Sequence, residues 1–96
     1  MDILLSELIE RTRNCIRSFE LSPSTVSHYQ TAWQALADYF LEHDQSLFSR
    51  PLAEQYLRES KAKLEAGIIT RRRYQRGHQS VHMLLEYFES GQVAWK

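Results

Sequence analysis

The chain has 96 residues, a formal net charge of zero, and 43% hydrophobic, 11% aromatic and 25% charged residues. This length and composition fit one globular domain and exclude both a second folded domain and a disordered tail. No segment has the roughly 20 apolar residues of a membrane-spanning helix, and acidic residues stand near the start where a secretion signal is basic. We therefore expect a cytoplasmic protein without a membrane partner. The single cysteine, Cys15, excludes an internal disulfide and a cysteine-based metal site.

The first segment predicts a helix over residues 3–19. Its apolar positions recur at spacings of three and four, which is the period of a helix with one buried face. These positions are Leu4, Leu5, Leu8, Ile9, Thr12, Ile16 and Phe19.

The second segment, residues 21–43, gives the clearest helix signal in the chain. Ser22 is a good N-cap and Pro23 suits the first helical turn. The apolar stripe that follows has the same helical period and consists of Val26, Tyr29, Trp33, Leu36 and Phe40. We interpret the aromatic members as core residues rather than as a platform for stacking bases.

Two further helices are predicted in the second half. Ser49 and Pro51 repeat the start signal, and Gly67 ends a helix over about residues 50–66. Thr70 caps a fourth helix that Gly91 closes, and its apolar face carries Tyr74, Gly77, Val81, Leu84, Leu85 and Phe88.

These elements predict an all-α protein, a compact bundle of four helices over residues 1–91, with no strand alternation and no internal repeat. Gly77 costs about 1 kcal/mol relative to alanine in the middle of a helix. Because it falls on the apolar face, we expect a close helix crossing at this position.

The charges are segregated along the chain although they sum to zero. Residues 21–49 contain three acids (Asp38, Glu42 and Asp44) and no Lys or Arg, whereas residues 66–85 contain four arginines and no acid. A local excess of arginine is the usual electrostatic sign of a nucleic-acid-binding surface.

The four arginines lie at the start of the predicted fourth helix. At 100° per residue, Arg72, Arg76 and Gln79 point away from its apolar face, and Arg71 and Arg73 flank them. Arginine pairs with guanine or phosphate and glutamine pairs with adenine, so this surface fits double-stranded DNA. The alternative interpretation is a solvated face. Cations oppose the helix dipole at an N-terminus, which favours a functional reason for them.

The predicted second helix carries a complementary polar face. Hydroxyl and amide groups near a helix N-terminus are suited to phosphate, because free backbone amides point the same way. The candidate DNA-binding residues here are Ser24, Thr25, Ser27, His28 and Thr31. Capping and simple solvent exposure are the alternative for Ser24 and Thr25.

The sequence predicts neither catalysis nor a cofactor for this chain. It has no nucleophile beside a base, no paired carboxylates and no glycine-rich phosphate loop. His78 and His82 stand one helical turn apart, but no third ligand is evident, so we expect packing or phosphate contact rather than a metal site.

The chain resembles the SAM-like core-binding domain at the N-terminus of tyrosine recombinases, the phage integrase family. The resemblance covers about residues 3–91. The matching positions are Ser24, Thr25, Tyr29, Trp33, Leu36, Tyr39, Tyr56, Leu57, Thr70, Arg73, Leu84 and Tyr87, followed by Gly91.

The resemblance implies a module that binds one side of a duplex during DNA integration and recombination. Its second and fourth helices then lie near the major groove, and its partners are the DNA, the catalytic domain of the same polypeptide and other recombinase protomers. The family's catalytic tyrosine and His-x-x-Arg motif belong to that second domain, and no His-x-x-Arg occurs here. Residues 92–96 are accordingly interpreted as the start of an interdomain linker, an expectation that fails if the gene ends at Lys96.

Two other functions remain open from the residues alone. A helical protein-interaction or oligomerisation module without DNA binding would present Leu41, Phe48, Met83 or Trp95 as an exposed apolar patch. A simple helix-turn-helix regulator would bind DNA tightly as a dimer of this chain.

Overall fold

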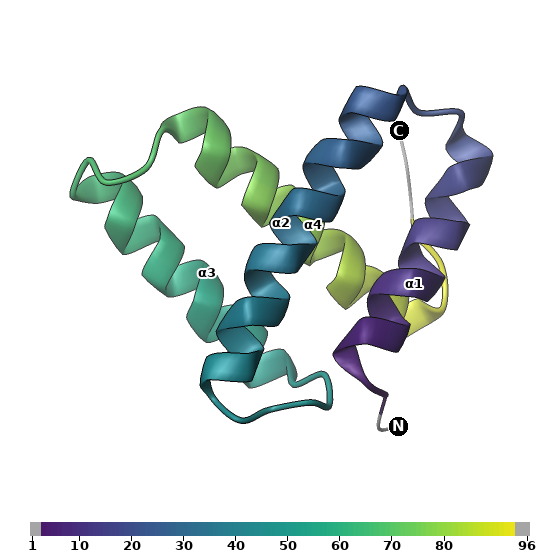
Figure 1. Cartoon of the computed structure of the whole chain (residues 1–96), viewed down its shortest axis with the longest axis horizontal. Coiled ribbons are helices and arrows are strands. Elements are labelled where there is room, and N and C mark those ends of the chain that lie inside the picture. The colour runs from purple at the N-terminus through teal and green to yellow at the C-terminus, as the bar shows by residue number, and fades with distance from the viewer. Residues whose placement is uncertain (1–2, 94–96) are drawn as a thin grey trace.

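The computed structural model describes residues 3–93, which form an all-α protein without a strand in that range (Figure 1). Four helices follow one another along the chain: α1 (Leu5–Ile16), α2 (Pro23–Glu42), α3 (Arg50–Glu65) and α4 (Arg71–Ser90). A short 3-10 helix, η1 (Arg17–Phe19), continues α1. The four-helix, all-α prediction is confirmed, and the radius of gyration of 13.0 Å is that of a compact domain of this length.

The predicted helix starts are confirmed by their hydrogen bonds. The side-chain oxygens of Ser22, Ser49 and Thr70 accept hydrogen bonds from backbone amides three residues later, at 3.3, 3.4 and 3.1 Å. Each cap satisfies an amide that has no partner inside its helix. Gly91 ends α4 in the left-handed conformation, with φ of 78°. These caps fix where α2, α3 and α4 begin.

The first helix is shorter than its periodicity predicts. Ile3 and Leu4 pair with the segment that leads into α3: the Phe48 amide donates to the Ile3 carbonyl at 2.7 Å, and the Leu5 amide donates to the Ser46 carbonyl at 3.0 Å. At the other end, the last turn tightens into η1, and Glu20 adopts φ of 54°. The prediction of one helix over about 3–19 is therefore wrong at its start, where long-range backbone pairing replaces the helical hydrogen bonds, whereas its end at Phe19 is confirmed with a 3-10 last turn.

The core lies where α2 crosses α4, and these two helices form the most extensive helix contact in the fold (Figure 1). Trp33 and Leu36 of α2 pack there with Val81 and Leu84 of α4, and all four side chains are buried. The indole Nε1 of Trp33 donates a hydrogen bond to the Ser80 carbonyl at 2.9 Å. This bond satisfies the one polar atom of the largest core side chain and fixes the position of α2 along α4.

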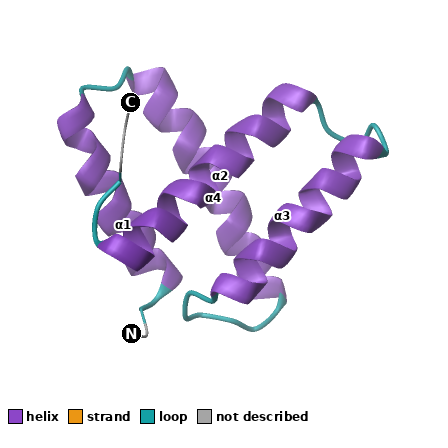
Figure 2. Ribbon diagram, turned by 180° about the vertical axis from the view of Figure 1, so that it is seen from behind, coloured by secondary structure: helices purple, strands orange, loops and turns teal. Residues whose placement is uncertain are grey.

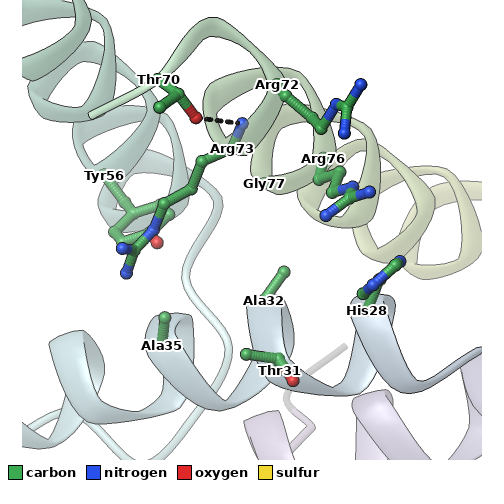
Figure 3. Close-up of a pocket in the computed structure, with 10 residues that line it drawn as sticks. All are labelled: His28, Thr31, Ala32, Ala35, Tyr56, Thr70, Arg72, Arg73, Arg76 and Gly77. Carbon is green, nitrogen blue, oxygen red and sulfur yellow. Dashed lines mark hydrogen bonds between the residues drawn. The ribbon is translucent and has the colours of Figure 1, made fainter. Parts of the chain in front are cut away.

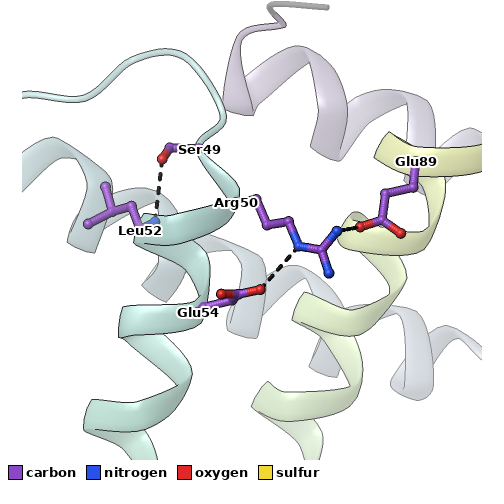
Figure 4. Close-up of polar contacts among 5 residues, drawn as sticks. All are labelled: Ser49, Arg50, Leu52, Glu54 and Glu89. Atoms are coloured by element: carbon purple, nitrogen blue, oxygen red, sulfur yellow. Dashed lines mark hydrogen bonds and ion pairs between the residues drawn. The ribbon is translucent and has the colours of Figure 1, made fainter.

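The other two helices cover opposite sides of this crossing, as the view from behind shows (Figure 2). On the α3 side, Phe48 packs between Phe40 and Phe88, with ring centroids 6.1 and 4.9 Å apart. Arg50, at the start of α3, forms ion pairs with Glu54 in its own helix and with Glu89 near the end of α4 (Figure 4). The start of α3 is thus held to the end of α4.

The last residue that the structure describes, Val93, lies in the core rather than in solvent. Val93, which the sequence places in a tail, is buried among the core side chains. The remaining residues of the predicted linker, 94–96, lie outside the described residues. Within residues 3–93, none of the helices combines the length and the apolar character needed to cross a membrane.

The crossing of α2 on α4 predicts the effect of a conservative change at its centre. Trp33→Phe removes a buried hydrogen bond and part of the ring volume, so the free energy of unfolding should fall by about 2 kcal/mol. Urea denaturation followed by circular dichroism measures this change. The matched control, exposed Leu41→Ala, should shift stability by less than about 0.5 kcal/mol. Equal losses in the two variants would contradict the assignment of the Trp33 bond as the centre of the fold.

Candidate nucleic-acid interface

The predicted arginine surface lies on the first half of α4 and is exposed. Thr70 caps the helix, which places Arg71, Arg72 and Arg73 in its first turn, and Arg76 follows one turn later. All four side chains and Gln79 are exposed, whereas the opposite edge of α4 contributes Val81, Leu84 and Leu85 to the core. The sequence correctly predicts which face of α4 is polar.

A hollow with a volume of about 330 Å³ lies between this face and α2 (Figure 3). Three helices line it: α2 along one wall, α4 along the other and α3 at one end. The lining residues are His28, Thr31, Ala32, Ala35, Tyr56, Thr70, Arg72, Arg73, Arg76 and Gly77. We refer to it as the α2–α4 hollow.

Half of the predicted DNA-binding residues meet in the α2–α4 hollow. They are His28 and Thr31 from α2 and Arg72, Arg73 and Arg76 from α4. The structure therefore brings together groups that stand more than forty positions apart in the printed sequence. The Thr31 hydroxyl donates to the Ser27 carbonyl at 3.0 Å, which leaves the oxygen lone pairs able to accept a hydrogen bond.

The other half lies outside the hollow. Ser24 and Thr25 belong to the cap of α2, since their hydroxyls lie 3.2 and 2.8 Å from the Ser22 hydroxyl. Ser27 lines a shallower depression on α2 together with Gln34 and Asp38. Arg71 and Gln79 are exposed on α4 but are not lining residues. These hydrogen bonds agree with the capping interpretation of Ser24 and Thr25.

The hollow is positively charged because no acid offsets its arginines. No Asp or Glu is among its lining residues. The ion pairs found within residues 3–93 join Arg11 to Glu7 and Arg50 to Glu54 and Glu89, so the four arginines of α4 take no part in them. Guanidinium groups without a carboxylate partner remain available to an anionic ligand.

The arginines of the hollow differ in direction. Arg73 extends toward Tyr56 of α3, whereas Arg72 and Arg76 extend toward the other end of the hollow, where His28 stands (Figure 3). Burial raises the pKa of Tyr56, and the Ser60 hydroxyl and the Arg73 charge partly offset this rise. Arg73 thus lies at the Tyr56 end of the hollow, and the side chains of Arg72 and Arg76 extend away from that end.

Tyr56 and two alanines are parts of the hollow that sequence reasoning missed. Tyr56 follows the helical period of the apolar residues in α3, which predicts a core position. Its half-buried ring also forms one end of the hollow. The Tyr39 ring holds it edge to face at a centroid distance of 5.1 Å. Ala32 and Ala35 lie three residues apart on α2, and this pair of small residues opposite Gly77 is the signal that could have indicated a depression.

Gly77 does not mark a close helix crossing, so that prediction is wrong. A Cβ atom built at Gly77 would meet no heavy atom within 4 Å other than its local helix backbone and chain neighbours. The glycine instead opens one wall of the hollow. Periodicity places Gly77 on the inner side of α4, but it does not show that the opposing residues are too small and too distant to fill the space.

His78 and His82 form a pair of neighbouring rings on α4. Their ring centroids lie 4.8 Å apart, and Tyr74 lies 5.8 Å from His78. Among residues 3–93, no three His, Cys, Asp or Glu side chains gather as a metal site would require. Burial lowers the pKa of His78, and the nearby His82 lowers it further.

The apolar patch expected for a protein-interaction module is only partly present. Phe48 and Met83 are buried, which contradicts their expected exposure, and Trp95 lies outside the described residues. Leu41 is 75% exposed and lines a depression between α1 and α2 that also includes Leu4.

No family model, curated protein or solved structure matches this chain.

The empty space at Gly77 predicts that a methyl group there stabilises the protein. Gly77→Ala removes the entropic cost of glycine in a helix and meets no obstructing atom, so the free energy of unfolding should rise by about 0.5 to 1 kcal/mol. Urea denaturation is the measurement. A loss of stability would show that the space beside Gly77 is filled.

The burial of His78 predicts a pH dependence of folding. Its pKa is lower in the folded protein than the ordinary 6.5, so the unfolded chain binds more protons, and stability falls as the pH drops through about 6.5 toward the lower folded value. Urea midpoints at pH 5 and pH 7.5 should differ in this direction. The difference should shrink in His78→Gln. An identical pH dependence in this variant would remove His78 as its source.

Proposed function

We propose that this chain binds double-stranded DNA through the α2–α4 hollow and the exposed arginine face of α4, as the N-terminal core-binding module of a site-specific tyrosine recombinase. The observation that carries the DNA-binding part is the meeting of Arg72, Arg73 and Arg76 with His28 in one hollow that no carboxylate lines. A polyanion is the ligand that such a surface attracts most strongly.

The arrangement suits a duplex because its cations are exposed along the first half of one helix, α4. Arg72 and Arg76 stand one turn apart on α4, and Gln79 continues the exposed face along the same helix. Guanidinium groups at this spacing can clamp phosphates or pair with guanine, and the amide of Gln79 can pair with adenine. On the other side of the hollow, α2 adds the His28 imidazole, and the Thr31 oxygen can accept a hydrogen bond. In this proposal, phosphate contacts set the position and the residues of α4 read the bases.

The recombination part of the proposal depends on the resemblance to core-binding domains. Strand cleavage would come from a catalytic domain of the same polypeptide, and other recombinase protomers would occupy the same DNA. The all-α arrangement of four helices agrees with such a module, as it agrees with many others.

The alternative function, a helical protein-interaction module, has less support. Two of its four expected apolar anchors, Phe48 and Met83, belong to the core. Leu41 remains as its exposed side chain. Light scattering of the chain alone over a range of concentrations separates the two functions, because salt-independent self-association in the absence of DNA would favour the alternative.

DNA binding predicts a steep dependence on salt. If the four arginines of α4 each contact one phosphate, the slope of log affinity against log salt should be about −3 to −4. Arg72→Ala with Arg76→Ala should reduce the slope by about 2 and weaken binding to all sequences. Fluorescence anisotropy of a labelled duplex between 50 and 200 mM salt, about the range over which such effects are large, measures both quantities.

The matched control is Arg58→Ala. Arg58 is exposed on α3 and does not line the α2–α4 hollow. Its removal takes away the same charge from the whole chain while leaving the proposed site intact. Equal effects of Arg58→Ala and of either Arg72→Ala or Arg76→Ala would reduce the interaction to a general charge effect and contradict the proposal.

A further inference from the structure

Gly77 leaves space at the floor of the α2–α4 hollow, and a glycine at this position makes α4 less stable than an alanine would. Gly77 stands in the interior of α4, where alanine would be more favourable, and a Cβ atom there would meet nothing within 4 Å. Its φ angle is not positive, so the backbone does not require glycine. Neither packing nor backbone conformation explains why this position is a glycine. A ligand that occupies the space beside Gly77 would explain it.

The hollow has two chemically different parts. Its floor consists of Ala32 and Ala35, which project into it from α2, together with Gly77 and the ring of Tyr56, beside which the Arg73 side chain lies (Figure 3). Its rim is cationic, with Arg72 and Arg76 on α4. A phosphate ion would use the rim alone, and a neutral apolar molecule would use the floor alone. A ligand with a flat ring and an attached phosphate uses both.

The volume is sufficient for such a ligand. At about 330 Å³ the hollow is at the lower end of the range of small-molecule sites, which begins at roughly 300 Å³. The Tyr56 ring is held by Tyr39, so it offers a positioned surface against which a base can stack. The backbone of a paired duplex cannot fill the floor, because its bases remain inside the helix.

We propose that the α2–α4 hollow binds one unstacked nucleotide, with the base on the floor formed by Ala32, Ala35, Gly77 and Tyr56 and the phosphate on Arg72 and Arg76. This inference rests on the DNA-binding function proposed above and adds a ligand class to the same site. The nucleotide comes either from an unpaired position in DNA or from a free mononucleotide. An unpaired position is the less costly of the DNA sources, since no base pair has to be broken.

The experiment compares two pairs of probes on the wild-type chain. In the first arm, a duplex with one bulged nucleotide is compared with the fully paired duplex. The bulged duplex should bind about tenfold more tightly, which is the effect of one stacked base. In the second arm, a free mononucleotide is compared with inorganic phosphate by chemical shift titration. A preference in the first arm identifies DNA as the source, and a preference in the second alone identifies a free nucleotide.

Variants that fill the floor test whether the preference arises in this hollow. Gly77→Leu projects a side chain over the floor and leaves the arginines in place, and Ala35→Met fills the same space from α2 if the first variant does not fold. Either should reduce the ratio of the two affinities, that for the bulged duplex over that for the paired duplex, from about tenfold to about one. Gly77→Ala, which adds one methyl group, should retain most of it.

The outcomes separate this inference from the function on which it rests. No preference in either arm, or a preference that survives in Gly77→Leu and Ala35→Met, overturns the nucleotide site. Arginine-dependent binding of the paired duplex would then still support the DNA-binding function. If the wild-type chain binds neither duplex but prefers the mononucleotide to inorganic phosphate, and Gly77→Leu abolishes that preference, duplex binding is overturned. The nucleotide site is then still supported.

Discussion

The hydrogen bond from the Trp33 indole to the Ser80 carbonyl, at the buried crossing of α2 and α4, is the contact on which the rest of the structure depends. It sits directly beside the α2–α4 hollow, because Ala32 precedes Trp33 and Gly77 lies one turn before Ser80. The Ser80 hydroxyl also donates to the Gly77 carbonyl at 2.8 Å. Core and candidate site are therefore built from adjacent positions on the same two helices.

The positive and negative charges lie in different regions of the molecule, although the net charge is zero. Arginines without carboxylate partners gather at the start of α4, whereas the acids Asp38 and Asp44 border the depression at the far end of α2. A polyanion is attracted to the first region and repelled by the second. The neutral total thus fits a domain that binds DNA on one side only.

Local features of the fold could be predicted from the sequence, and contacts between distant segments could not. The caps at Ser22, Ser49 and Thr70 act over three residues, so the helix starts were predictable. The shortening of α1 depends on pairing between Ile3 and Phe48, which no periodicity reveals. For the candidate site, the helical period identified the exposed arginines. The contribution of Tyr56 and the empty space at Gly77 depend on how three helices meet.

The most direct test of the central claim is a chemical shift titration of the isotope-labelled chain with a paired DNA duplex. Our account predicts that the amide shifts concentrate on the start of α4, at residues 70–77, and on the facing part of α2, at residues 28–35. Shifts confined to the surface around Leu4 and Leu41, or no shifts at low salt, would contradict it.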